Sequence, residues 1–78
     1  MALTDDEIEL IDTTIKKIEA IQDKYHAKVA EIYELVHGFR TLREDTPKNV
    51  DCTLMTDEQV QTSKANLLTH AQTIIDTW

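Results

Sequence analysis

Glycine, proline and cysteine each occur only once in the 78 residues of this sequence. Strands joined by tight turns usually depend on glycine and proline, so their scarcity argues against a fold rich in β-structure. A single cysteine excludes an internal disulfide, and no Cys/His spacing typical of a zinc finger is present. The chain therefore lacks two common supports of a small fold, and we expect association with other chains to supply stability.

Basic residues are also scarce, because eight lysines and arginines stand against 15 acidic residues, which gives a formal net charge of −7. Direct binding to nucleic acid requires a basic face, and so does binding to anionic lipid, so neither is expected. We expect no secretory leader, because the N-terminal residues carry no basic segment followed by an apolar one, and the sequence contains no apolar run of about 20 residues. The single cysteine, taken as a reduced thiol, favours a cytoplasmic protein, or a virion component if the source is viral, and the lack of a long apolar run predicts no membrane span.

A heptad pattern of apolar residues is the strongest feature that the sequence does contain. Its members lie alternately three and four residues apart, and only Gln22 interrupts them. The positions, which we call the seam with Gln22 included, are Ile8, Ile11, Ile15, Ile18, Gln22, Tyr25, Val29, Ile32, Val36 and Phe39. A repeat of about 3.5 residues over this length predicts one continuous helix, about residues 5–44, whose apolar stripe faces other helices throughout.

Two capping boxes mark the predicted starts of helices. Thr4 with Glu7, and Thr56 with Gln59, match the pattern in which the two residues exchange hydrogen bonds between side chain and backbone. The first box opens the long helix. The second box predicts another helix at about residues 57–77.

Residues 45–55 form the predicted loop, because Pro47 cannot continue a helix. The second helix is about half as long as the first and pairs with the C-terminal half of it. The predicted fold is one all-α domain over residues 1–78, folded as an antiparallel helical hairpin. Its predicted core consists of Val29, Ile32, Val36, Phe39, Val60, Leu67, Ala71, Ile74 and Trp78.

The N-terminal half of the seam has no partner in such a hairpin. Burying each isoleucine there is worth about 1.5–3 kcal/mol. We therefore expect copies to associate as a coiled coil or helical bundle, a homodimer or tetramer, with the antiparallel direction favoured by charge. The predicted oligomer interface is Ile8, Ile11, Ile15, Ile18, Gln22 and Tyr25. Within it, Gln22 either sets the register or points to water where the seam shifts.

Another architecture follows if the long helix is interrupted. Gly38 has poor helix propensity, although it could also allow a close helix crossing, and Gln22 is the polar member of the seam. A break at either place would fold the chain into a three-helix bundle that covers its own seam.

Few residues in the sequence are suited to catalysis or to metal binding. His26, His37 and His70 lack the compact four-ligand spacing of a zinc site, and Cys52 has no neighbouring base that would activate it as a nucleophile. The sequence also contains no glycine-rich phosphate loop and no Ser/His/Asp arrangement. We predict a protein that is not an enzyme and has no metal or cofactor site.

The leading functional prediction is a protein–protein interaction and assembly module that oligomerises through the seam, as a structural component or assembly factor of a larger complex such as a virion. One alternative is an acidic regulator that occupies the basic, nucleic-acid-binding surface of a target protein. Its contact face would be Asp5, Asp6, Glu9 and Asp12. The other alternative is a subunit of a hetero-complex whose partner supplies the missing helix.

Overall fold

The computed structural model describes residues 3–44 and 46–78. Within them the chain forms helices and one isolated β-bridge, and no strand. The helices are α1 (Asp5–Tyr25), α2 (Val29–Leu42) and α3 (Asp57–Thr77). The predicted all-α class is confirmed.

The first two helices are separated by a turn at residues 26–28. His26 has φ 53° and ψ 34°, and Lys28 has φ 56° and ψ 27°, so both lie in the left-handed helical region. The continuous helix predicted over residues 5–44 is therefore wrong, and the interruption comes shortly after Gln22. A heptad pattern records which residues face a core. One long helix and two helices that fold back on each other satisfy it equally well.

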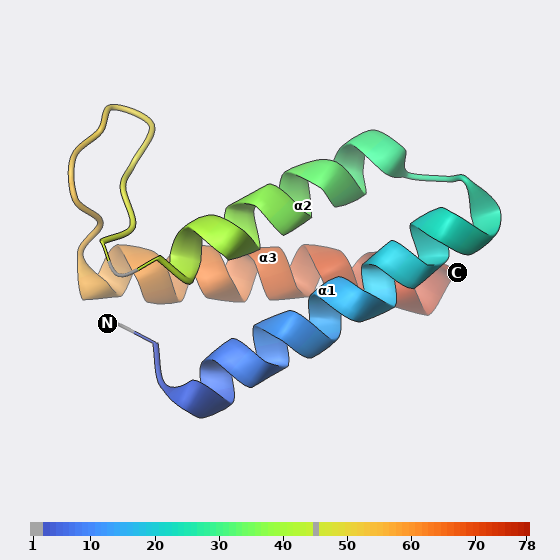
Figure 1. The fold of residues 1–78 in the computed structure, drawn as a ribbon, viewed down its shortest axis with the longest axis horizontal. Coiled ribbons are helices and arrows are strands. Elements are labelled where there is room, and N and C mark those ends of the chain that lie inside the picture. The colour runs from blue at the N-terminus through green and yellow to red at the C-terminus, as the bar shows by residue number, and fades with distance from the viewer. Residues whose placement is uncertain (1–2, 45) are drawn as a thin grey trace.

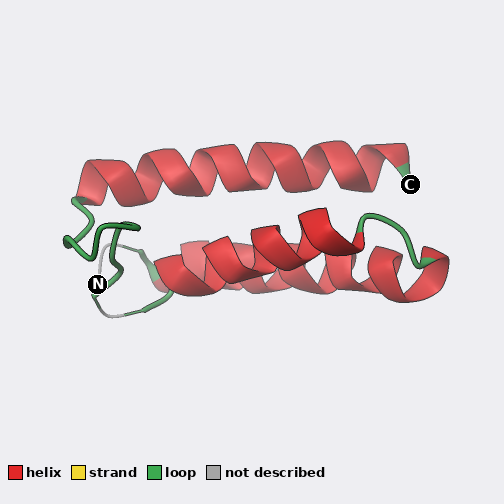
Figure 2. Ribbon diagram, turned by 90° about the horizontal axis from the view of Figure 1, so that it is seen from above, coloured by secondary structure: helices red, strands yellow, loops and turns green. Residues whose placement is uncertain are grey.

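The three helices form a bundle in which each packs against the other two. α1 and α3 run in the same direction, and α2 runs antiparallel to both (Figure 1). Seen from above, α3 forms one layer and the pair of α1 and α2 forms the other (Figure 2). The molecule measures 36 × 27 × 16 Å. The arrangement is thus a three-helix bundle, the second architecture considered from the sequence, in place of a two-helix hairpin.

Both predicted capping boxes are formed. Thr4 Oγ1 accepts a hydrogen bond from the Glu7 backbone at 3.2 Å, and Glu7 Oε1 accepts one from the Thr4 backbone at 3.0 Å. Thr56 and Gln59 exchange the same two bonds at 3.1 and 3.0 Å. At the start of α2, by contrast, Lys28 makes no side-chain cap. Local sequence thus sets where α1 and α3 begin, whereas α2 begins at a left-handed turn.

Apolar residues from all three helices, together with Leu3 just before α1, fill one core. The buried ones are Leu3, Ile11, Ile15, Ile18, Ile32, Leu35, Val36, Phe39, Leu42, Val60, Ala71 and Ile74. Gly38 lies inside α2, where a Cβ atom would stand 3.1 Å from Cδ2 of Leu67 on α3. Gly38 therefore permits a close crossing of α2 and α3, and it does not break the helix.

Hydrogen bonds within the loop hold the segment between α2 and α3. Asp51 Oδ1 accepts from the Thr53 hydroxyl at 2.6 Å and from the Thr53 backbone at 3.2 Å, and these bonds lower the pKa of Asp51. Asn49 Nδ2 donates to Gln59 Oε1 at 3.3 Å, which attaches the loop to the first turn of α3. The side chain of Val50 is fully exposed.

Candidate association surface

Most of the seam is buried inside the single chain. Ile11, Ile15 and Ile18, which belong to the predicted oligomer interface, are 0%, 6% and 0% exposed. Ile8 is partly buried and packs against the same core. The premise that this half of the seam has no partner within the chain is wrong, because the helices of one copy cover it.

The predicted hairpin core is distributed over the same bundle. Among its members, the structure buries Ile32, Val36, Phe39, Val60, Ala71 and Ile74. Leu67 is partly buried, whereas Val29 and Trp78 are about half exposed. The core also contains Leu35 and Leu42, which the predicted set omits. Their spacing of seven residues was a signal for a second stripe on α2.

Exposure of the seam is concentrated where α1 turns into α2. Tyr25 and Val29, the seam residues on either side of the turn, are 44% and 49% exposed. The Tyr25 ring lies 5.4 Å from the Trp78 ring at the end of α3, with an angle of 41° between the ring planes. The ammonium group of Lys24 lies 5.2 Å from the centroid of the Tyr25 ring. We call Tyr25 and Val29 the open seam positions.

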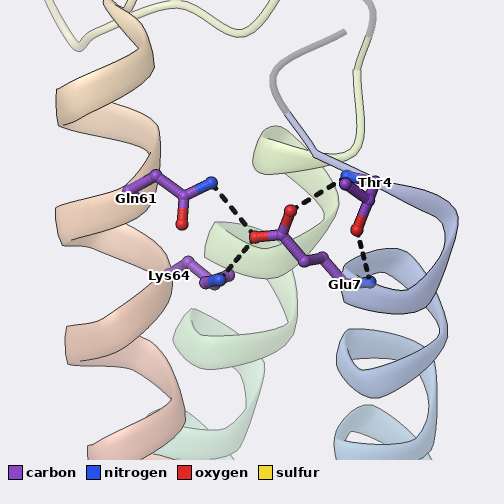
Figure 3. A network of polar contacts seen from close by, with 4 residues as sticks. All are labelled: Thr4, Glu7, Gln61 and Lys64. Atoms are coloured by element: carbon purple, nitrogen blue, oxygen red, sulfur yellow. Dashed lines mark hydrogen bonds and ion pairs between the residues drawn. The ribbon is translucent and has the colours of Figure 1, made fainter.

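A polar network at the opposite end of the bundle attaches α1 to α3 (Figure 3). Glu7 Oε2 forms an ion pair with Lys64 Nζ and accepts a hydrogen bond from Gln61 Nε2 at 3.1 Å. Its other oxygen accepts the capping bond from the Thr4 backbone. The bond from Lys64, followed by those from Thr4 and Gln61, lowers the pKa of Glu7 from 4.5 to about 2. One carboxylate thus serves both the helix cap and the contact between helices.

The predicted acidic face is divided in the structure. Asp12 Oδ1 lies 2.9 Å from Nη1 of Arg43, the residue that follows α2, so this carboxylate is paired within the chain. Asp5, Asp6 and Glu9 are exposed. Asp5 and Asp6 stand in the first turn of α1, where their charge complements the helix dipole.

The side chains capable of catalysis or metal binding are dispersed. All three histidines are exposed, and His70 Nε2 lies 3.9 Å from Glu31 Oε2. Cys52 is exposed in the loop. Across residues 3–44 and 46–78, no group of three or more His, Cys, Asp or Glu side chains could hold a metal ion. None of the helices described in this range is long and apolar enough to cross a membrane.

One hollow lies between α2, α3 and the loop. It has a volume of about 530 Å³ and is lined by residues that include His37, Gly38, Asn49, Met55 and Leu67. The lining also includes the polar residues Thr41, Lys48, Ser63 and Asn66.

The chain matches no protein-family model, no curated protein and no solved structure.

Proposed function

We propose that this protein is a non-enzymatic assembly module that associates with copies of itself through the seam and in that form builds a larger complex. The observation that carries the proposal concerns the turn at residues 26–28. The seam continues through this turn in strict heptad register although the helix does not. The apolar seam residues that flank it, Tyr25 and Val29, are about half exposed in one copy.

A single bundle does not require the heptad register to continue across the turn. Each helix must direct its own apolar stripe toward the core, and the turn can absorb any offset between the two stripes. Yet Tyr25 and Val29 stand four residues apart and join the stripe that ends at Ile18 and Gln22 to the one that resumes at Ile32. A spacing that a single copy does not require supports an assembled state in which these positions are buried.

The net charge of the chain distinguishes self-association from binding to a basic target, because salt affects the two in opposite directions. A chain with net charge −7 repels its own copies, and this repulsion acts over a Debye length of about 10 Å at 0.1 M salt. Added salt should therefore strengthen self-association. An acidic regulator on a basic target, the second candidate function, rests on the exposure of Asp5, Asp6 and Glu9 and would lose affinity under the same change.

The test is the molar mass in solution, measured by light scattering on a size-exclusion column over a concentration series at low and high salt. We expect a dimer or tetramer whose population rises with concentration and with salt. Replacing the open seam positions, as Tyr25→Gln with Val29→Gln, should shift the chain toward the monomer. A monomer at every concentration and salt would refute the proposal.

A matched control removes exposed apolar side chains that do not belong to the seam. Tyr33 is 72% exposed on α2 and Leu54 is 63% exposed in the loop. Tyr33→Gln with Leu54→Gln should leave the oligomer intact. An equal loss of oligomer in both double variants would show general surface stickiness, which contradicts a role of the seam.

A further inference from the structure

We infer that associating copies exchange α1. The turn at residues 26–28 opens, α1 and α2 join into one helix, and α1 of each copy packs against α2 and α3 of the other. This inference rests on the proposed self-association and states how the two copies fit together. Its partner is a second copy of this chain, and the exchanged element is residues 5–25.

The turn has the geometry of a chain reversal but the composition of a helix. His26 and Lys28 adopt the left-handed conformation, which disfavours every residue with a Cβ atom. Ala27 between them has the highest helix propensity of any residue, and His26 and Lys28 are both compatible with a helix. Neither glycine nor proline, the usual residues of a fixed reversal, is present there. Opening the turn into helix therefore releases backbone strain.

The turn also stands at a symmetry centre of the seam. Positions 25 and 29 are equally distant from Ala27, and the same is true of 22 and 32, of 18 and 36, and of 15 and 39. Two antiparallel helices over residues 5–42 that cross at Ala27 would therefore oppose seam positions equally distant from Ala27, and each would place its α1 beside α2 of the other copy. Tyr25 of one copy then stands opposite Val29 of the other, which gives the open seam positions a partner.

The contacts that attach α1 to the rest of the bundle can be re-formed between chains. Glu7 on α1 pairs with Lys64 on α3, and Asp12 on α1 pairs with Arg43 after α2. Neither pair involves the turn, so both survive the exchange with the partner copy's residues. An exchange of an identical element keeps the core contacts and changes only the hinge, which here is the turn at residues 26–28. Such an exchange is therefore a low-cost route to a dimer.

The ion pair of Glu7 and Lys64 provides a test with the unmodified chain. A water-soluble carbodiimide joins a carboxylate and an amine in direct contact, with loss of water and no spacer. Chains grown on ordinary and on heavy nitrogen are mixed in denaturant, refolded at high concentration and separated by size. The dimer fraction is then cross-linked, digested and analysed by mass spectrometry. The linked peptides of Glu7 and Lys64 report which chains are in contact.

If α1 is exchanged, linked peptides that combine the two isotopes should appear in the dimer as often as random pairing predicts. Lys64→Arg keeps the charge but removes the amine, so this control should lose the linked peptide. A dimer in which every such peptide carries one isotope would refute the exchange and leave self-association standing. A chain that stays monomeric would refute both.

Hinge variants supply a second, independent readout. Glycine at positions 26 and 28 favours the left-handed turn and disfavours a continuous helix, and alanine does the reverse. We expect His26→Gly with Lys28→Gly to raise the dimer dissociation constant by about tenfold or more, and His26→Ala with Lys28→Ala to lower it. Two closed bundles that meet through their surfaces should respond to neither pair, and that result would refute the exchange.

Discussion

The left-handed turn predicts how glycine at positions 26 and 28 changes the free energy of unfolding. The sign of this change distinguishes a left-handed turn from a continuous helix. Replacing His26 and Lys28 by glycine should stabilise the bundle at concentrations where the chain is monomeric. A residue with a Cβ atom in this conformation costs about 1–2 kcal/mol, and glycine adds about 0.5–1 kcal/mol of backbone entropy to the unfolded chain. The net gain is therefore about 0.5–1 kcal/mol at each position.

If the chain formed one continuous helix across these positions, the effect would have the opposite sign. Glycine in the interior of a helix costs about 1 kcal/mol relative to alanine and somewhat less relative to histidine or lysine. The two interpretations thus differ by roughly 2–3 kcal/mol for the double variant.

The assay is urea unfolding followed by circular dichroism at low micromolar concentration. We expect the midpoint to rise without a change in its slope, and the melting temperature to rise by about 4–8 °C for each kcal/mol. Lys17→Gly and His37→Gly, at exposed positions inside α1 and α2, are the matched controls and should each lose up to about 1 kcal/mol. A loss in His26→Gly with Lys28→Gly that equals the loss in these controls would show that the turn is not left-handed.

Three further predictions follow from the packing and the charges. Ile18→Ala at a fully buried position should lower the free energy of unfolding by about 2–5 kcal/mol in urea, and a loss below about 1 kcal/mol would mean that this residue lies outside the core. Because the pKa of Glu7 is lowered from 4.5 to about 2 on folding, its stabilising contribution is complete above pH 4.5 and is lost as the pH falls toward 2. Glu7→Gln should therefore flatten the decline of stability in that window, and an unchanged acid titration would contradict the role of Lys64. Asp12→Asn should change stability by only about 0–1 kcal/mol, because Asp12 and Arg43 are 40% and 41% exposed, and a larger loss would contradict the screening expected for such a pair.

Sequence patterns predicted the helix starts because a capping box is a local exchange of hydrogen bonds. Thr4 with Glu7 and Thr56 with Gln59 lie within four consecutive residues each, so no distant part of the chain is needed to form them. The end of α1 was missed for the opposite reason. His26 and Lys28 are residues that helices accept, and nothing in their identity requires a left-handed conformation.

The same error led to the expectation that the N-terminal half of the seam lacks a partner within the chain. Treating residues 5–44 as one helix leaves Ile11, Ile15 and Ile18 without a partner, so an oligomer was required to bury them. Once the chain reverses at Ala27, α2 and α3 of the same copy bury them. The open seam positions, Tyr25 and Val29, could be identified only after the reversal was located.

Periodicity and capping are local patterns, and they suffice to predict that this chain is helical and where two of its helices begin. They also predict which residues face a core. These properties depend on neighbours within one or two helical turns. Only the tertiary structure decides where the chain reverses, and whether the same copy or another copy covers the seam. Both depend on the balance between backbone strain at His26 and Lys28 and the burial of a whole helix face. That balance involves residues more than 50 positions apart, such as Glu7 and Lys64, and it exists only once the helices are packed together.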